Sequence, residues 1–321
     1  MITEGILNIN KPQDMTSHDV VSVVRRTLGI RKVGHTGTLD PMATGVLPVC
    51  VGRSTRIMEY LDLDMKRYRC SMVLGIETDT QDIWGQVTAE KPAEVTEDQI
   101  RRVFASFDGV IDQKPPMYSA LKVNGKRLYE YAREGKTVDV KTRKVFLRNL
   151  CVEDISASSE GLPQITFSVE CSKGTYIRTI CQDAGLALGT YGTMTALQRT
   201  ASGIFDLGSA ITLNQLADMD EEERGTHMLP TWKPLSAFGK VVCGEEAGLR
   251  FAAGWHLPLE QCRIQRRPRY EETAFVLPAR EDFRRAYCVF APIGGQETFL
   301  GVACYNDQYK KLVADKVFFV R

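Results

Sequence analysis

The chain has 321 residues, with 41 Lys and Arg against 40 Asp and Glu, so its formal net charge is +1. This length predicts about two domains, with enough residues for a core that needs no disulfide or metal. The balanced charge excludes a protein that coats nucleic acid through overall charge alone, but a local basic patch stays compatible with it.

Residue patterns predict helices and strands that alternate irregularly along the first two thirds of the chain. Thr16 and Asp19 form a capping box before one helix, and Gly29 ends it. The clearest segments are strands over 5–9, 68–74 and 165–171, and helices over 17–28, 97–107 and 176–188. Because they keep no strict β-α-β rhythm, we expect an α+β fold with a mixed, largely antiparallel central sheet flanked by helices.

A domain boundary is predicted after the acidic run 218–223 and the Pro230–Pro234 segment. Beyond it, a short helix over 245–253 precedes strand candidates over 287–290, 299–304 and 317–320. We therefore expect a first domain over 1–236 and a small β-rich domain over 237–321.

The nine cysteines and four histidines lack the close pairs that zinc sites show, since the sequence has no C-x-x-C and no H-x-x-x-H. We expect reduced, mostly buried thiols and no metal. The N-terminus lacks the pattern of a signal peptide, and no apolar run approaches the roughly 18 residues of a membrane span. These features predict a cytoplasmic protein with no membrane partner.

The segment Gly34–Gly45 holds three glycines and one carboxylate, Asp40, which precedes a proline and therefore lies on extended or turning backbone. A simple turn explains this composition. The flanking apolar runs favour a functional loop, in which a lone Asp acts as nucleophile or base and a distant cation keeps it ionised.

Residues 114–148 contain ten Lys or Arg against three acids, a local net charge of +7, with three tyrosines interleaved. This pattern favours a phosphate-binding patch over a solvated surface. A smaller candidate of the same kind holds Arg263, Arg266, Arg267 and Arg269. In a third segment, 171–179, a strand ends and a helix begins, so Tyr176 and Arg178 either face a cleft or serve as a core aromatic and a surface cation.

Taken together, these segments resemble the TruB family of tRNA pseudouridine synthases. The resemblance rests on motifs that occur in the family's order over about residues 5–230: NKPQDMTSHDVV (10–21), GHTGTLDPMATGVLPV (34–49), KRYRC (66–70), LGIETDTQD (74–82), PPMYSALKVNGKRLYEYAREG (115–135), CSKGTYIRTI (171–180) and LQRTASG (197–203). The region after about Lys240 resembles the family's C-terminal PUA-type RNA-binding domain only loosely.

The resemblance implies that the chain isomerises uridine to pseudouridine at position 55 in the T loop of tRNA, by base flipping and without a cofactor. It implies the pseudouridine synthase fold and a T-arm partner. Nothing in the sequence demands a partner subunit, so we expect a monomer.

The family's site residues fall on six positions here. Asp40 is implied as the catalytic carboxylate, which attacks C1′, attacks C6 or removes the C2′ proton. Tyr68 is implied to stack on the base, and Arg178 to pair with Asp40. The remaining implied contacts are Tyr176 and Leu197 in the pocket and His35 in the space that the flipped base leaves.

For the RNA backbone we expect contacts from cations near the site and in segment 114–148: Lys11, Lys126, Arg127, Lys141, Arg143 and Lys144. Two other classes stay open. A tRNA-binding or chaperone protein without catalysis needs no acid in the pocket, and a carboxylate-nucleophile hydrolase needs a water-activating base near Asp40, which the sequence does not indicate.

Overall fold

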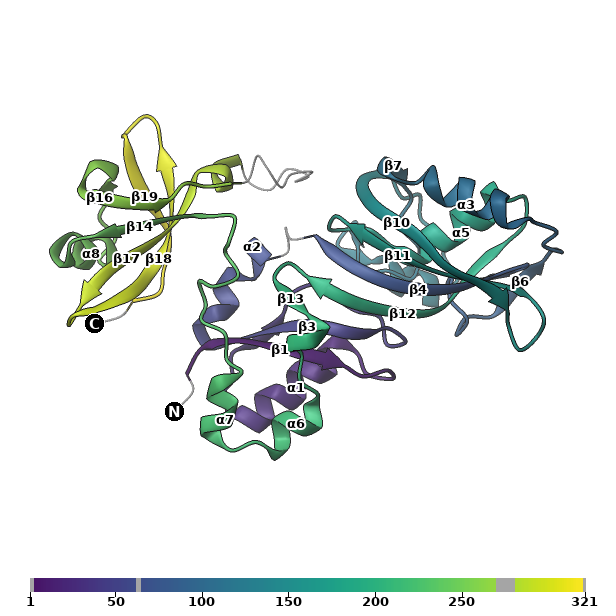
Figure 1. Cartoon of the computed structure of the whole chain (residues 1–321), viewed down its shortest axis with the longest axis horizontal. Helices are drawn as coiled ribbons and strands as arrows, with labels where there is room; N and C mark the ends of the chain where they lie inside the picture. Colours follow the sequence, from purple (N-terminus) through teal and green to yellow (C-terminus); the bar gives the residue numbers. More distant parts are fainter. Residues whose placement is uncertain (1–2, 62–64, 270–280, 320–321) are drawn as a thin grey trace.

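The N-terminal two thirds of the chain form one long sheet, described here from a computed structural model that covers residues 3–61, 65–269 and 281–319 (Figure 1). The strands follow the order β1-β3-β12-β4-β11-β10-β7, with β2 beside β3 and β13 beside β12. Only β12 and β3 run parallel among these pairs, so the expected mixed, largely antiparallel sheet is confirmed. The strands are β1 (Gly5–Lys11), β2 (Val33–His35), β3 (Thr44–Val51), β4 (Lys66–Leu74), β7 (Gly109–Gln113), β10 (Arg143–Ala157), β11 (Pro163–Cys171), β12 (Gly192–Ser202) and β13 (Phe205–Asp206).

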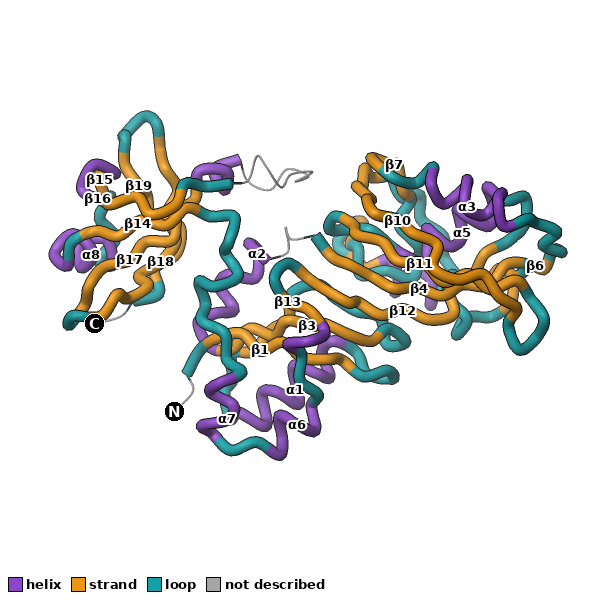
Figure 2. The backbone as a smooth tube through the Cα atoms, viewed as in Figure 1, coloured by secondary structure: helices purple, strands orange, loops and turns teal. Residues whose placement is uncertain are grey.

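Helices flank this sheet where the sequence predicts amphipathic segments. Thr16 caps α1 with the expected capping box, and Gly29 ends it in the left-handed conformation with φ 67°. Helices α3 and α5 pack beside the β10–β4 half of the sheet, whereas α1, α6 and α7 gather near β1 (Figure 2). The helices of this part are α1 (Ser17–Leu28), α2 (Met58–Leu61), α3 (Glu97–Ala105), α4 (Leu128–Arg133), α5 (Ile177–Ala187), α6 (Leu213–Asp218) and α7 (Glu221–Thr226).

Two small hairpins complete the first part of the fold, together with short 3₁₀ turns of three to six residues. One hairpin follows β4 directly and the other lies within the basic segment 114–148. The hairpin strands are β5 (Ile76–Thr78) with β6 (Val87–Glu90), and β8 (Lys122–Val123) with β9 (Lys126–Arg127).

A second sheet begins at Gly239 and has the order β15-β19-β18-β17-β14-β16, with α8 (Glu245–Ala252) packed against it. Its strands are β14 (Gly239–Cys243), β15 (Leu257–Pro258), β16 (Cys262–Arg266), β17 (Ala286–Ile293), β18 (Gln296–Asn306) and β19 (Lys311–Val317). The small β-rich domain is thus present, and the predicted strands over 287–290 and 299–304 are confirmed.

The sequence predicts a strand over 317–320, and this prediction is wrong for the described residues. Strand β19 spans Lys311–Val317 and ends where the predicted strand begins, and Val320 lies outside the described residues. Phe318 is apolar for another reason. Its buried ring joins a cluster with residues of the first sheet, and its carbonyl accepts a hydrogen bond of 2.6 Å from Arg53. This segment therefore packs the two sheets together instead of extending one of them.

The nine cysteines are free thiols and seven of them are buried, as the sequence predicts. In the part of the chain that the structure describes, no helix is long and apolar enough to cross a membrane.

Candidate active site

Asp40 lies on the loop between β2 and β3, and the loop is fixed on both sides of it. The Ser17 hydroxyl donates to the Leu39 carbonyl at 3.0 Å and accepts from the Leu39 amide at 2.8 Å. On the other side, the Ala43 amide donates to the Asp40 carbonyl at 3.0 Å, and the side chains of Leu39 and Ala43 are buried. The Asp40 carboxylate keeps 40% of its side-chain surface exposed. A rigid loop thus presents an accessible carboxylate.

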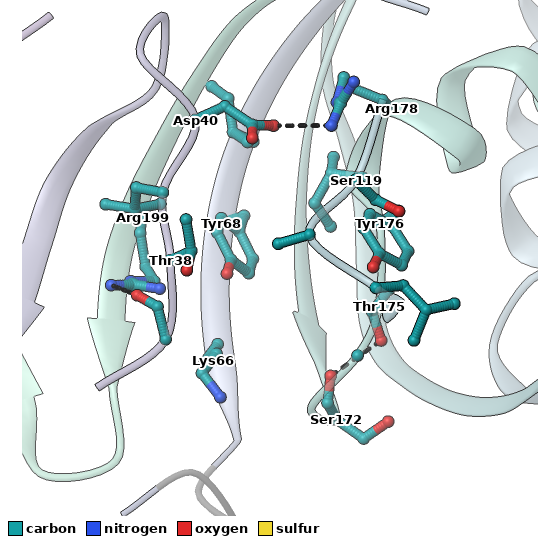
Figure 3. Close-up of a pocket in the computed structure, with 17 residues that line it drawn as sticks. Thr38, Asp40, Lys66, Tyr68, Ser119, Ser172, Thr175, Tyr176, Arg178 and Arg199 are labelled. Carbon is teal, nitrogen blue, oxygen red and sulfur yellow. Dashed lines mark hydrogen bonds and ion pairs between the residues drawn. The ribbon is translucent and has the colours of Figure 1, made fainter. Parts of the chain in front are cut away.

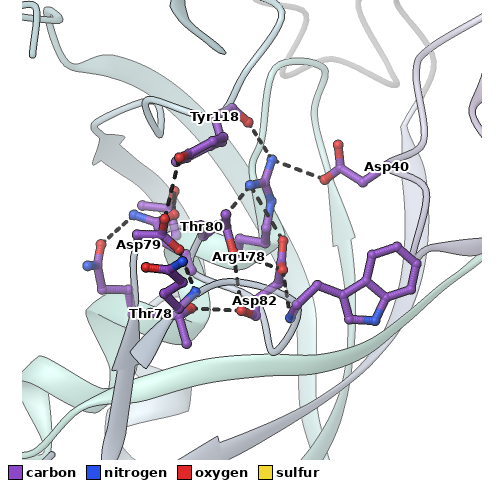
Figure 4. A network of polar contacts seen from close by, with 12 residues as sticks. Asp40, Thr78, Asp79, Thr80, Asp82, Tyr118 and Arg178 are labelled. Carbon is purple, nitrogen blue, oxygen red and sulfur yellow. Dashed lines mark hydrogen bonds and ion pairs between the residues drawn. The ribbon is translucent and has the colours of Figure 1, made fainter. Parts of the chain in front are cut away.

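Arg178, in the first turn of α5, faces this carboxylate (Figure 4). Its Nη2 lies 3.1 Å from Asp40 Oδ2, and its side chain is 6% exposed. Nη1 donates to the Thr80 carbonyl and Nη2 to the Tyr118 carbonyl, both at 2.8 Å. Because two carbonyls hold the guanidinium, the predicted Asp40–Arg178 pair is present with a fixed geometry.

Asp82 is a second carboxylate beside Arg178, which the sequence reasoning missed. Its Oδ2 lies 3.7 Å from Arg178 Nη1, and its Oδ1 accepts hydrogen bonds from the Thr80 hydroxyl and the Trp84 amide. Burial raises the pKa of Asp82, although the Thr80 hydroxyl and Arg178 favour its ionised form. Arg178 therefore bridges a buried carboxylate and an accessible one.

A cavity of about 320 Å³ opens at Asp40, and five of the six predicted pocket residues line it (Figure 3). Asp40 and Arg178 form one end, Tyr68 of β4 lies on one wall and Tyr176 on the opposite wall. Leu197 of β12 also lines the cavity. Gln113, itself buried, fixes the backbone of Tyr176 through two hydrogen bonds of 2.8 and 3.0 Å. This volume lies in the range of small-molecule sites.

Tyr68 is 8% exposed, so its ring is mostly buried but still lines the cavity. Burial raises the pKa of its hydroxyl, and the neighbouring Arg199 opposes that shift. At neutral pH the hydroxyl is therefore protonated. Lys66 and Arg199 also line this cavity, and the sequence reasoning assigned neither of them to it. The signal was present, because alternation places Lys66 on the inward face with Tyr68, and Arg199 on the inward face with Leu197.

The prediction that Lys11 contacts the RNA backbone is wrong. Lys11 has no exposed surface, and its Nζ donates to the carbonyls of Pro12, Met15 and Pro41 at 2.8, 2.6 and 3.3 Å. Burial lowers its pKa to about 8, although Asp40 favours the charged form. Lys11 therefore fixes the backbone next to Asp40 from inside the fold.

A wider cleft of about 790 Å³ adjoins the cavity and shares Asp40 and Arg178 with it. Its walls carry aromatic rings and cations, with His35 among them; these residues are His18, His35, Trp84, Tyr118, Lys122, Arg127, Tyr129 and Arg133. Burial is the main cause that lowers the pKa of His35, so this side chain is neutral at pH 7. Because His35 lines this cleft and not the cavity, it lies beside the cavity.

The other predicted backbone contacts lie on the surface of segment 114–148. Lys141, Arg143 and Lys144 are exposed. Lys126 forms an ion pair with Glu134, and its ammonium lies 4.8 Å from the centre of the Tyr131 ring. The cations of this segment are therefore unequal, because some already have partners in the protein.

In the second basic candidate, Arg266 is half-buried and donates to the carbonyls of Phe238 and Leu235 at 3.0 and 3.3 Å. Arg263, Arg267 and Arg269 are exposed. Arg266 therefore binds the backbone of the segment that connects the two sheets, just before β14. The other three cations of this group lie on the surface.

Among the described residues, no cluster of three or more His, Cys, Asp and Glu side chains has a geometry that could hold a metal ion. The cavity instead offers a carboxylate, a protonated phenol and cations around one small chamber. Such a site can bind a planar ring, exchange protons with it and stabilise charge on it.

Comparisons with known proteins show the family of this chain. Residues 25–177 match the model of the TruB family pseudouridylate synthase N-terminal domain, and residues 178–236 match that of the tRNA pseudouridylate synthase B C-terminal domain. The chain is 47% identical over 238 residues to tRNA pseudouridine synthase B of Alkaliphilus oremlandii, which covers 74% of this chain and 77% of that protein. It is 42% identical to the protein of the same name from Syntrophotalea carbinolica, over 92% of this chain and 94% of that one.

A solved structure resembles almost the whole chain. A chain in the crystal structure of a Cbf5-Nop10-Gar1 complex superposes with a TM-score of 0.71 and 26% identity, over 98% of this chain and 84% of that chain. The fold and the site together define a pseudouridine synthase. The chain belongs to the TruB family of pseudouridylate synthases and is therefore an isomerase.

Proposed function

We propose that this chain isomerises uridine to pseudouridine at position 55 in the T loop of tRNA, with Asp40 as the catalytic carboxylate. Relatives that share 42–47% of their residues with it are named tRNA pseudouridine synthase B. The observation that carries the proposal is the accessible Asp40 carboxylate, held 3.1 Å from the fixed Arg178 guanidinium at the mouth of a base-sized cavity. We infer that the protein acts as a cytoplasmic monomer on the T arm.

The reaction begins when the target uridine leaves the T loop. A uracil stacked in RNA hides the bond that must break, and its extrusion costs a few kcal/mol. Stacking on the Tyr68 ring offsets about 1–3 kcal/mol of that cost. The adjoining cleft, where aromatic rings and cations alternate, is suited to the flanking nucleotides. His35 lies at the edge of that cleft, where it can fill the space left by the base.

Arg178 keeps Asp40 ready to react. The Arg178 guanidinium lies 3.1 Å from the Asp40 carboxylate and orients it, and the carbonyls of Thr80 and Tyr118 prevent Arg178 from turning away. Asp40 can then attack C1′, attack C6 or remove the C2′ proton. Each route breaks the N1–C1′ bond and lets the ring turn inside the cavity, so that C5 forms the new bond to C1′.

Tyr68 is placed for the last step. Once C5 has joined C1′, its proton must leave, and a phenol oxygen beside the stacked ring can relay it. Residues 1–236 would carry this reaction. The exposed cations of segment 114–148 would bind tRNA phosphates, and residues 237–321 would bind the acceptor-stem end.

The test is to map the product. An unmodified tRNA transcript and a matched transcript with U55→C are incubated with the protein, and pseudouridine is located by carbodiimide treatment and primer extension. We expect modification at position 55 of the first transcript and none in the second. Modification at another uridine, with position 55 unchanged, would overturn the assigned position.

A further inference from the structure

Two buried cations, Arg199 of β12 and Lys66 of β4, lie on the opposite side of the Tyr68 ring from Asp40. In Figure 3 the ring of Tyr68 lies between Asp40 and Lys66, and the Arg199 guanidinium lies level with the Tyr68 hydroxyl. Arg199 is 0% exposed and Lys66 is 6% exposed. The Asp40–Arg178 pair therefore occupies only one end of the cavity, and the other end has its own charge.

Arg199 is fixed by the protein through two of its three nitrogens, and the third completes no hydrogen bond of good geometry within the described residues. Its Nε donates to the Val46 carbonyl at 2.7 Å and its Nη2 to the Gly37 carbonyl at 3.2 Å. Its Nη1 is buried and makes no hydrogen bond of good geometry with the described residues. The Tyr68 hydroxyl, which also lines the cavity, interacts with this guanidinium. A buried donor without an acceptor is costly, so such a group in a cavity indicates a ligand atom that completes it.

Gly37 leaves room for both cations. A methyl group added at Gly37 would lie 3.3 Å from Arg199 Nη1 and 3.2 Å from Lys66 Cε. Of the described residues that line the cavity, Asp40 alone carries a carboxylate, and it faces Arg178 at the other end. The charged side chains that line the Arg199 end of the cavity are therefore cations, which suits a ligand atom with negative charge.

We propose that Arg199, with Lys66 beside it, binds a carbonyl oxygen of the flipped uracil and stabilises the negative charge that the ring gains during isomerisation. This inference rests on the proposed function. When the C1′–N1 bond breaks after attack at C1′ or loss of the C2′ proton, the electron pair stays on the ring and spreads over N1 and the carbonyl oxygens. Attack at C6 also places an electron pair on C5 and O4. When C5 joins C1′, the electron pair of the ring forms the new bond and the ring becomes neutral, while Asp40 leaves the atom that it attacked or returns the C2′ proton. C5 then loses its proton and N1 gains one, which completes pseudouridine.

The position of Asp40 decides which part of the nucleotide reaches Arg199. Asp40 must meet the ribose or the near edge of the ring, so the ring extends over Tyr68 and its far oxygens approach Arg199. A phosphate is the alternative ligand. It would have to leave water for a site with no exposed surface, whereas a base enters uncharged and gains charge only inside.

The experiment compares two leaving groups in Arg199→Gln. Transcripts carry uridine or 5-fluorouridine at position 55, and cleavage of the original nucleoside is followed under single-turnover conditions with saturating enzyme, by digestion and chromatography. Fluorine withdraws electrons and stabilises the ring anion by itself. We expect Arg199→Gln to slow the uridine reaction by roughly 10²-fold, to slow the 5-fluorouridine reaction at least tenfold less, and to leave tRNA affinity within about threefold.

Two further variants keep the test decisive. Lys66→Gln leaves the carbonyl contacts of Arg199 intact, so it carries the same comparison if Arg199→Gln unfolds, which thermal unfolding reveals. Arg69→Gln is the matched control, because Arg69 is exposed on the other face of β4 and pairs with Glu153; we expect wild-type rates.

Equal losses with both leaving groups, or a loss of affinity alone, would overturn the inference and indicate packing or a phosphate ligand. If the wild-type protein produces no pseudouridine, the proposed function fails. If the wild type is active and the Arg199 and Lys66 variants match it, only the present inference fails.

Discussion

The cations of the cavity and the cations of segment 114–148 differ in how the protein holds them. Arg178 and Arg199 are buried, and backbone carbonyls fix both guanidinium groups. Lys141 and Lys144 are exposed, and Lys126 shares an ion pair on the surface. A fixed, buried charge acts strongly on one atom, whereas an exposed charge attracts a polyanion weakly and is screened by salt.

This difference separates two roles. Variants of the cavity should change the rate of the chemical step at saturating enzyme, while variants of the surface segment should change affinity and its salt dependence. Substitutions in each region therefore test whether the two roles are separate.

The largest effect is expected from Asp40→Asn. The substitution removes the charge but keeps the shape, so turnover should disappear while tRNA affinity stays within about tenfold. Single-turnover isomerisation and filter binding measure the two quantities. Asp98→Asn, an exposed position in the first turn of α3, is the control. A substantial residual rate in Asp40→Asn would remove this residue from the catalytic role.

The second-largest effect is expected at Tyr68, where two substitutions separate stacking from proton transfer. Tyr68→Phe keeps the ring, so we expect near-normal stability and binding but a rate reduced by roughly 10²-fold or more. Tyr68→Leu should lose stacking, about 1–3 kcal/mol, as well as the chemical step. Isomerisation is measured beside thermal unfolding. Full activity in Tyr68→Phe would leave only stacking, and full activity in Tyr68→Leu would make this a core residue.

The surface segment should give a smaller effect that depends on salt. Neutralising Lys126, Arg127, Lys141, Arg143 and Lys144 together should weaken tRNA binding and lower the log–log salt slope, by about 0.7–0.9 for each phosphate that the protein no longer neutralises. Because Lys126 already pairs with Glu134, its single neutralisation should change the slope less than that of Lys141. Binding is titrated at several salt concentrations. An unchanged slope would show that the segment does not bind phosphate.

Lys11 should make the free energy of unfolding depend on pH. Its pKa is about 8 in the folded protein against an ordinary value of 10.5, so between these values the unfolded chain binds more protons. Stability from this group therefore rises with pH in that window, by at most about 1.4 kcal/mol per pH unit. The difference in unfolding free energy between wild type and Lys11→Met should grow from pH 8 to pH 10 in urea titrations. A constant difference would mean that the Lys11 pKa is not shifted.

The sequence predicted the elements whose signals are local. The capping box at Thr16, the alternation in 68–74 and the helix after Tyr176 all depend on neighbouring residues, and the structure has them. The Asp40–Arg178 pair joins residues far apart in the chain, and it was predicted from the resemblance to a family.

The failures come from long-range packing. Lys11 looks like a surface cation in its turn, but the carbonyls that enclose it include that of Pro41, thirty positions away. Phe318 continues an apolar run, yet it leaves the sheet because the first sheet offers it a buried surface. No local pattern in the sequence marks Asp82 as a site residue, because its partner Arg178 lies on a helix far along the chain.

The most direct test of the central claim, that this cavity is a site of isomerisation and not only of RNA binding, is tritium release. Transcribed tRNA labelled at C5 of uridine is mixed with the wild-type protein, and the tritium that enters water is counted over time. Because the new bond forms at C5, we predict release of one tritium per tRNA, and none with Asp40→Asn. No release above background from a wild-type protein that binds this tRNA would contradict the account and indicate a binding protein without catalysis.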